Sequence, residues 1–200
     1  MPFLLSKRIS ESSAYAIWNI TETKDELEQL VSETPNSTHP NKISEWIVTR
    51  ILVRHLTEQF GIKYQGITKT ESGKPLLNGS KAEISITHSF PLAAAIINLH
   101  APTGIDLEWP RSKLIDVQHK FLHTSELAHK NDINALCKIW MCKEVLFKIY
   151  GRKSLSFKDE IQVDLRNNKA TGLLIKHSDN RTYDLRIEEV YYNHLLAYST

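Results

Sequence analysis

The sequence has few cysteines and no long apolar run, and each shortage excludes a class of protein. Its two cysteines, Cys137 and Cys142, are too few and too closely spaced for a disulfide framework or a zinc ribbon. No stretch approaches the roughly 18 consecutive apolar residues of a membrane-spanning helix, and the first residues lack the charge, apolar run and small residues of a signal peptide. We therefore expect a cytoplasmic protein with reduced thiols and no membrane partner.

Strong charge of either sign is also missing. The 200-residue chain has 25 Lys and Arg against 23 Asp and Glu, a formal net charge of +2. Nucleic-acid-binding domains are usually much more basic, so the sequence predicts no nucleic-acid partner. A hydrophobic content of 41% and a charged content of 24% are ordinary for a globular protein, and the length suits one large domain or two small ones.

Hydrophobic periodicity predicts a mixture of helices and strands. We expect helices over residues 42–60 and 132–150, a short one capped by Thr23, and one or two more within 113–130. Strands are expected at residues 14–20, 83–87, 92–99, 103–108, 160–165, 171–177, 182–190 and 194–199. This order indicates an α+β fold with an N-terminal half, residues 1–105, and a C-terminal half, residues 106–200.

Two acidic segments suggest the chemistry. In Gly-Ile-Asp-Leu-Glu, strand alternation places Asp106 and Glu108 on the same face. Further along, helical spacing places Trp140, Glu144 and Lys148 on one stripe. Three carboxylates that converge suit Mg²⁺, which prefers oxygen ligands and shares its coordination shell with substrate phosphates. A neighbouring lysine supplies positive charge for the same phosphates.

Taken alone, each feature also has a plainer explanation. An Asp-x-Glu pair at a strand end is often a solvated turn, and Glu144 with Lys148 at i, i+4 is a common surface stabiliser. Arg50 and Arg54 have the same spacing on the helix 42–60. They form either a solvated helix face or a cationic stripe that grips a phosphate.

Further polar residues lie near predicted turns. Lys74 belongs to a Gly-Lys-Pro turn, which is either a plain surface turn or a phosphate contact. His88 ends a strand that reads Ser-Ile-Thr-His-Ser, where it is an unremarkable histidine or a donor to a phosphate oxygen. His119 and His123 have a zinc-like i, i+4 spacing, but no third ligand is evident, so we expect no zinc.

In their order along the chain, four of these segments resemble the Sfp-type 4′-phosphopantetheinyl transferases. That family shows Gly-Lys-Pro, a strand ending in Ser-His-Ser, Gly-(Ile/Val)-Asp-x-Glu, and Trp-x-x-Lys-Glu-(Ala/Ser)-x-x-Lys. The matching segments here are residues 73–75, 85–89, 104–108 and 140–148. Each motif is unspecific alone, whereas all four in this order are specific. The resemblance spans about residues 46–160.

The chain departs from the family pattern at three points. Thr87 replaces the serine that usually precedes the histidine, and Val145 stands where a small residue is common. After Lys148 the family tends to show Gly-x-Gly-Leu-Ser, whereas residues 151–156 read Gly-Arg-Lys-Ser-Leu-Ser. This last difference affects the backbone after the helix and leaves the expected metal ligands intact.

The resemblance implies a pseudo-dimer of two similar α+β halves with the active site between them. The protein would move 4′-phosphopantetheine from coenzyme A to a serine of an apo carrier protein and release 3′,5′-adenosine bisphosphate. Asp106, Glu108 and Glu144 would bind Mg²⁺, with Mn²⁺ as the alternative ion. Glu144 is our choice for the base that takes the serine proton, and Lys148 would neutralise the pyrophosphate.

The resemblance also implies that a set of basic residues holds the phosphates of coenzyme A: Arg50, Arg54, Lys74, His88 and Lys148. It places Glu126 near the metal. We expect a monomer that acts on an acyl or peptidyl carrier protein of fatty-acid, polyketide, nonribosomal-peptide or lysine-pathway synthesis. The sequence does not distinguish between these pathways.

Two other functions stay open on the sequence alone. A catalytically inactive relative would keep the fold and bind coenzyme A or a carrier protein, and only the altered loop after Lys148 favours it. Another Mg²⁺-dependent phosphate enzyme, such as a nuclease, commonly has an acidic-x-Lys triplet beside the metal. Glu108-Trp109-Pro110 does not supply that triplet, and the near-neutral net charge does not suit a DNA substrate.

Overall fold

The structure is a computed structural model that describes residues 3–33, 35, 37–151, 154–166, 169–176 and 180–200. Over these residues the chain is an α+β protein with three antiparallel sheets, and it divides into two compact units, Met1–Thr103 and Gly104–Thr200. The boundary expected between residues 105 and 106 falls inside strand β7 (Ile105–Glu108). In the described part of the chain, no helix combines the length and apolarity that crossing a membrane requires.

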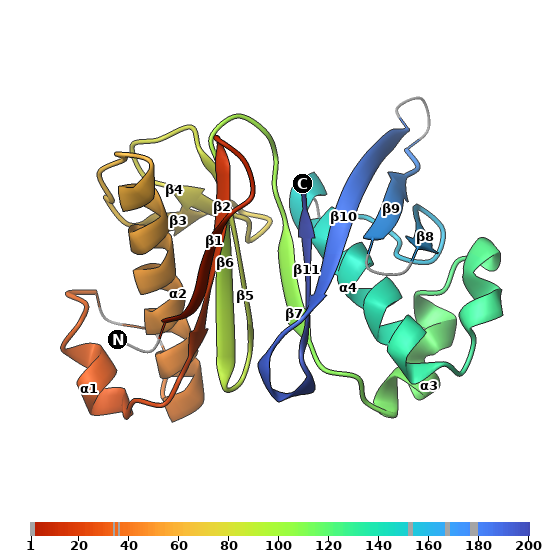
Figure 1. The fold of residues 1–200 in the computed structure, drawn as a ribbon, viewed down its shortest axis with the longest axis horizontal. Coiled ribbons are helices and arrows are strands. Elements are labelled where there is room, and N and C mark those ends of the chain that lie inside the picture. Colours follow the sequence, from red (N-terminus) through yellow and green to blue (C-terminus); the bar gives the residue numbers. More distant parts are fainter. Residues whose placement is uncertain (1–2, 34, 36, 152–153, 167–168, 177–179) are drawn as a thin grey trace. The chain divides into compact units, whose positions relative to one another are not determined.

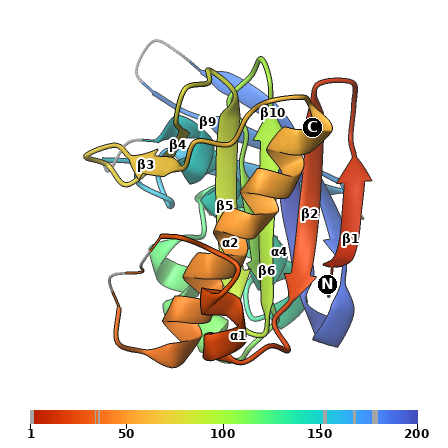
Figure 2. The same ribbon diagram turned by 90° about the vertical axis from the view of Figure 1, so that its left-hand side faces the viewer.

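The first unit contains a four-stranded antiparallel sheet with strand order β1-β2-β6-β5 (Figure 1). The strands are β1 (Phe3–Arg8), β2 (Ser13–Asn19), β5 (Glu83–Ser89) and β6 (Leu92–Asn98). A long helix, α2 (Pro40–Gln59), lies across one face of this sheet and shares a hydrophobic core with it (Figure 2). The unit also includes helix α1 (Lys24–Glu28) and a two-stranded sheet of β3 (Ile67–Lys69) and β4 (Pro75–Leu77).

Local sequence explains where these helices begin. Thr23 Oγ1 accepts the Glu26 N–H at 3.3 Å, and the Glu26 carboxylate accepts the Thr23 N–H at 2.8 Å. This capping box satisfies two backbone donors at the start of α1, as the sequence predicts. In α2, Pro40 occupies the first turn, where a missing N–H costs no helical hydrogen bond.

The second unit is a five-stranded antiparallel sheet with order β7-β11-β10-β9-β8, packed against a long helix, α4 (Ile133–Tyr150). The other strands are β8 (Ile161–Arg166), β9 (Lys169–Leu174), β10 (Arg181–Glu189) and β11 (Leu195–Ser199). The shorter helical segments are α3 (Lys113–Val117) and the 3-10 turns η1 (Gln118–Lys120), η2 (Thr124–His129) and η3 (Tyr191–Asn193).

Helix α4 has well-satisfied ends. Asp132 Oδ1 accepts the N–H groups of Asn134 and Ala135, each at 3.0 Å, which satisfies two donors that the first turn leaves unpaired. Gly151 ends the helix with a left-handed φ of 64°, a conformation that glycine adopts without steric cost. The helix predicted over residues 132–150 is therefore confirmed, and it is a rigid support for the side chains on its surface.

The predicted strands are all found, with small shifts at their ends, and the α+β class is confirmed. The sequence analysis missed β1 (Phe3–Arg8), which pairs with β2 at the sheet edge. The pseudo-dimer relation between the two halves stays a prediction. Part of the altered loop after α4, residues 152–153, lies outside the described residues.

Candidate functional site

Strand β7 and helix α4 approach each other closely because Gly104 has no side chain. A Cβ atom at this position would lie 2.5 Å from the carbonyl oxygen of Val145 and 3.2 Å from Cγ1 of Ile149. The first neighbour is backbone, so it moves only if the helix moves. The glycine of the Gly-Ile-Asp-Leu-Glu segment is therefore required for the strand-to-helix distance in the second unit.

This close approach brings Asp106 of β7 next to Lys148 of α4. The Lys148 Nζ lies 2.7 Å from Asp106 Oδ1 and donates to the carbonyl oxygen of Ile105 at 2.8 Å. The Asp106 side chain is only 7% exposed and that of Lys148 is 25% exposed. The ion pair thus ties the last turns of α4 to the strand that carries the carboxylates.

Glu108 lies two residues further along β7, on the same face as Asp106. Its Oε2 accepts from Arg111 Nη2 at 2.7 Å, and the side chain of Trp140 on α4 also hydrogen-bonds to it. Burial and the negative charge of Asp106 raise the pKa of Glu108, although Arg111, Trp140 and Lys148 oppose this shift. The pKa of Glu108 therefore depends on the charge of the neighbouring Asp106 carboxylate.

Glu144 of α4 is a carboxyl group with a strongly raised pKa. Burial raises the pKa of Glu144 to about 7, and the charges of Asp106 and Glu108 add to this shift while Lys148 opposes it. The predicted Trp140, Glu144 and Lys148 stripe thus faces the carboxylates of β7. A titratable group with a pKa near neutrality beside like charges is a frequent feature of functional sites.

The three carboxylates are electrostatically coupled, and cationic side chains hold two of them, Asp106 and Glu108. Across the described residues, no group of three or more His, Cys, Asp or Glu side chains is placed to hold a metal ion. Lys148 takes an oxygen of Asp106, and Arg111 takes one of Glu108. The donor set still fits Mg²⁺ chemically, because it consists of carboxylate oxygens. Binding the ion requires these ion pairs to rearrange.

A cavity of about 600 Å³ opens beside Glu144 within the second unit. Its walls are mostly aromatic and apolar, formed by Val117, Phe121, Trp140, Phe147 and Phe157. Three polar residues complete the lining: Lys120, Glu144 and Ser156. The ring of Trp140 lies 5.3 Å from those of Phe121 and Phe157, measured between centroids. A mostly apolar cavity with a few polar groups is the usual form of a small-molecule site.

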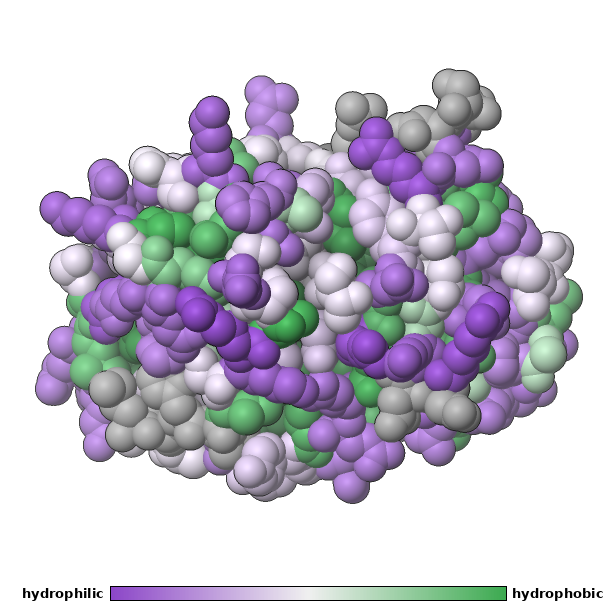
Figure 3. All heavy atoms as spheres, turned by 45° about the horizontal axis from the view of Figure 1, so that its top comes forward, coloured by the Kyte–Doolittle hydropathy of each residue, from purple (hydrophilic) through white to green (hydrophobic). Residues whose placement is uncertain are grey.

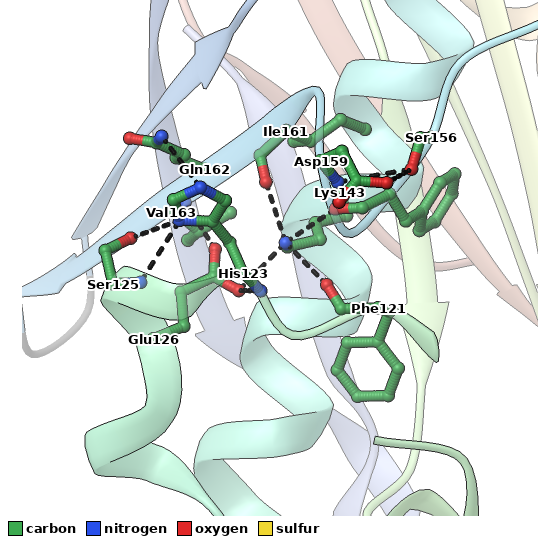
Figure 4. Close-up of polar contacts among 11 residues, drawn as sticks. Phe121, His123, Ser125, Glu126, Lys143, Ser156, Asp159, Ile161, Gln162 and Val163 are labelled. Atoms are coloured by element: carbon green, nitrogen blue, oxygen red, sulfur yellow. Dashed lines mark hydrogen bonds and ion pairs between the residues drawn. The ribbon is translucent and has the colours of Figure 1, made fainter. Parts of the chain in front are cut away.

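A buried ion pair joins Lys143 of α4 to Glu126 (Figure 4). Lys143 and Glu126 are 0% and 1% exposed, and the Lys143 Nζ lies 2.8 Å from Glu126 Oε2. The same ammonium group donates to three carbonyl oxygens, at 2.7 Å to Phe121 and at 2.8 Å to Phe157 and Ile161. Burial lowers the pKa of Lys143, and the hydrogen bond to Glu126 together with its negative charge opposes this shift.

Both oxygens of the Glu126 carboxylate accept hydrogen bonds in this network. Its Oε2 accepts the His123 N–H at 2.8 Å, and its Oε1 accepts the Val163 N–H at 2.7 Å. The resemblance places Glu126 near the metal, but the structure shows it bound to Lys143 and two backbone donors. His123, one of the two zinc-spaced histidines, uses Nδ1 to accept the Ser125 N–H at 3.1 Å.

In the first unit, two predicted phosphate-binding residues are paired with carboxylates. Lys74 forms an ion pair with Glu83 of β5. His88 Nδ1 lies 3.2 Å from Glu45 Oε2, and the same oxygen accepts from Lys42 Nζ at 3.0 Å. The His88 side chain is 41% exposed, so it is open to a ligand from solvent.

On α2, Arg50 of the predicted arginine stripe already contacts other side chains of the first unit. Arg50 is buried: its Nε donates to Glu33 Oε2 at 3.2 Å, and its guanidinium lies 3.3 Å from the ring centroid of Trp46. Arg54 is half-buried. Burial raises the pKa of Tyr64 to about 12, and the positive charge of Arg54 opposes this shift. The structure therefore places the charge of Arg50 inside the unit, where a phosphate would compete with Glu33.

The two cysteines of α4 are free and buried, as expected for ordinary thiols. Burial raises the pKa of Cys137 to about 12 and that of Cys142 still further. A thiol that stays protonated at neutral pH is a poor nucleophile. Neither cysteine belongs to the candidate site.

Sequence reasoning missed the aromatic cavity and the role of Lys143. Phe121, Phe147 and Phe157 come from separate segments, so no single window of sequence shows that they line one space. Lys143 lies next to Glu144 inside the fourth motif, and the only available signal was a lysine on the apolar side of a predicted helix. No protein-family model and no curated protein matches the chain, so the family resemblance depends on the four motifs alone.

Proposed function

We propose that this protein transfers the 4′-phosphopantetheine group of coenzyme A to a serine of an apo acyl or peptidyl carrier protein, with Mg²⁺ as its metal. The observation that carries this proposal is the coupling of Asp106, Glu108 and Glu144 with Lys148 in one region of the second unit. This grouping unites the third and fourth motifs in one site. The pseudo-dimer relation of the halves is part of the same proposal.

Asp106, Glu108 and Glu144 would hold the metal ion, which when bound would stabilise negative charge on the pyrophosphate of coenzyme A. Reactions of this type depend on positioning and charge neutralisation more than on covalent catalysis. Lys148 adds a positive charge at the same place. Lys148, which lies beside Asp106, would face the leaving group.

Glu144 is the residue best suited to accept the proton of the attacking serine. Without metal, burial raises the pKa of Glu144 to about 7, so this carboxyl group can exchange a proton near physiological pH. It lines the cavity, so a substrate in that space lies within reach of its carboxylate. The serine Oγ would attack the phosphorus while Glu144 takes the proton, and 3′,5′-adenosine bisphosphate would leave.

The cavity beside Glu144 is suited to the pantetheine chain. That chain is a flexible aliphatic group with two amides, and it needs apolar walls with a few hydrogen-bonding groups. Phe121, Trp140, Phe147 and Phe157 supply the walls, and Ser156 supplies a hydroxyl group. The transferred group would then lie next to the proposed base.

The phosphates and adenosine of coenzyme A would be held by basic residues of the first unit. Lys74 and His88 are the better candidates, since both are partly exposed. Arg50 and Arg54 stay part of the proposal, although Arg50 would have to exchange Glu33 for phosphate. These residues would bind the phosphates equally in the ground state and in the transition state.

The proposal is tested by incubating the protein with coenzyme A, Mg²⁺ and a panel of apo carrier proteins, followed by intact-mass measurement. We expect at least one carrier to gain the mass of one phosphopantetheine, and only when a divalent cation is present. Asp106→Ala and Glu144→Ala should each abolish the gain while the protein stays folded. If the folded wild-type protein binds coenzyme A but modifies no carrier, an inactive relative is the better account.

A further inference from the structure

A charged pair is buried next to the proposed base along helix α4. Lys143 precedes Glu144 on α4, and both Lys143 and Glu126 are shielded from solvent. We propose that Lys143 is a positioning residue which, together with Glu126, fixes two aromatic walls of the cavity and so places the transferred chain. This inference rests on the proposed function and adds a role for a residue outside the reacting groups.

The ammonium group of Lys143 joins segments that are distant in sequence. It donates to the carbonyl oxygens of Phe121, which follows η1, and of Phe157, which precedes β8. It also donates to Ile161 at the start of β8. Three chain segments are thereby bound to one side chain of α4, as Figure 4 shows for Phe121 and Ile161.

Two of these carbonyl groups belong to residues that line the cavity. When the backbones of Phe121 and Phe157 turn their oxygens towards Lys143, the directions of their Cα–Cβ bonds are constrained as well. Their rings both meet the ring of Trp140, with centroid separations of 5.3 Å. Lys143 therefore holds the backbone of two residues that line the cavity, without lining the cavity itself.

Glu126 completes the arrangement from the opposite side. An ammonium group has three protons, and Lys143 has four acceptors within 2.8 Å, so one proton is shared. Glu126 balances the buried charge and also binds the N–H of Val163 on β8. Hydrophobic replacements of buried ion pairs are often equally stable. The charged pair is therefore better explained by the geometry it imposes than by stability.

The decisive variant is Lys143→Met, with Lys143→Arg beside it and Lys138→Met as the matched control. Lys138 lies half-buried on the same helix and outside the cavity. The first readout is the indole N–H resonance of Trp140 in a heteronuclear NMR spectrum, assigned with Trp140→Phe. It should shift or broaden in Lys143→Met and stay unchanged in Lys138→Met, with or without any activity.

The second readout compares two ligands of the wild-type and variant proteins. Coenzyme A carries the pantetheine chain, whereas 3′,5′-adenosine bisphosphate lacks it. Lys143→Met should raise the KM for coenzyme A about tenfold or more and leave the inhibition constant of the bisphosphate within about twofold. Lys143→Arg, which keeps charge and donors, should recover part of the loss.

These measurements separate the possible failures. An unchanged Trp140 resonance in folded Lys143→Met overturns the positioning role. Equal loss of affinity for both ligands also overturns it, because that result indicates general loosening. If Lys143→Met does not fold because Glu126 is left as an unpaired buried charge, the double variant Lys143→Met/Glu126→Gln is judged by the same two criteria. If the wild-type protein transfers nothing, the proposed function fails, and the Trp140 resonance alone decides the positioning role.

Discussion

At the scale of single residues, the candidate site balances negative charge against positive charge. Burial and the negative charge of Asp106 raise the pKa values of Glu108 and Glu144, while Lys148 opposes both shifts and Arg111 opposes that of Glu108. A divalent cation would relieve the same repulsion more effectively. This balance makes the site sensitive to pH and to metal in ways that can be measured.

We expect the metal-free protein to lose stability as the pH rises from about 4.5 to 7. The folded-state pKa of Glu144, about 7, is above the value of 4.5 for a free glutamate, so the folded state keeps a proton that the unfolded state has lost. The stability contribution is therefore complete below the unfolded pKa and disappears as pH passes the folded pKa. Its size is at most about 3 kcal/mol.

The measurement is urea unfolding of the wild type and of Glu144→Gln across this pH range. The difference in unfolding free energy between the two should change with pH, because only the wild type titrates at this position. Added Mg²⁺ should stabilise the wild type more at pH 8 than at pH 5, since the ion needs ionised carboxylates. A difference that is flat with pH would contradict the assigned environment of Glu144.

Lys148 and the basic residues of the first unit should have different kinetic effects. Lys148 faces the carboxylates and should act mainly as charge develops on the leaving group. Lys148→Ala should therefore lower kcat about a hundredfold while changing coenzyme A binding little. Lys74→Ala and His88→Ala should mainly raise the KM for coenzyme A, because those residues would hold phosphate throughout the reaction.

Steady-state kinetics with coenzyme A and its 3′-dephospho form test this division. A residue that grips the 3′-phosphate should lose its mutational effect when that phosphate is absent. If Lys148→Ala and Lys74→Ala give the same pattern with both substrates, then neither is aimed at the reacting centre. They would then form one general basic surface.

Periodicity was sufficient to group Asp106 with Glu108, and Glu144 with Lys148, but not to show which charged side chains pair. Asp106, Glu108 and Glu144 follow from strand and helix periodicity, which is local information. The pairing of Arg50 with Glu33, or of Lys143 with Glu126, joins residues seventeen positions apart through tertiary packing. Such contacts depend on the folded arrangement of several elements, so periodicity did not reveal them.

At the scale of elements, the site depends on the distance between β7 and α4. Secondary structure was largely predictable because Thr23, Asp132 and Gly151 mark helix ends with their usual chemistry. The close approach at Gly104 was not predictable, since it reflects contact with the backbone of Val145. Strand β1 was also missed, because its pairing with β2 supplies what its short mixed sequence lacks.

Gly104→Ala should separate β7 from α4 and weaken the site. The new Cβ would meet the Val145 carbonyl oxygen at 2.5 Å, so the helix must move and carry Glu144 and Lys148 with it. We expect a loss of about 1–3 kcal/mol in unfolding free energy and a larger relative loss of transfer activity.

Gly172→Ala is the matched control for this substitution. Its Cβ would meet Cδ1 of Leu146 at 2.4 Å, a buried side-chain atom that a rotamer change can move, whereas the Val145 oxygen belongs to the backbone. It should therefore cost less stability and keep activity. Thermal unfolding and transfer rates for the two variants make the comparison, and equal effects on activity would contradict the proposed importance of the β7–α4 distance.

At the scale of the whole molecule, the chain consists of two compact α+β units, each with its own sheet and long helix. On the face drawn in Figure 3, hydrophobic residues form small groups among hydrophilic ones, which is ordinary for a globular protein. The metal-binding and base functions are assigned to the second unit and the phosphate contacts to the first.

The central claim is that Asp106, Glu108 and Glu144 form one divalent-cation site. The most direct test is a titration of the protein with Mn²⁺, followed by electron paramagnetic resonance, for wild type, Asp106→Asn and the surface control Asp184→Asn. We predict that Asp106→Asn weakens Mn²⁺ binding about tenfold or more and that Asp184→Asn leaves it unchanged. Equal Mn²⁺ affinity in all three proteins would contradict the claim.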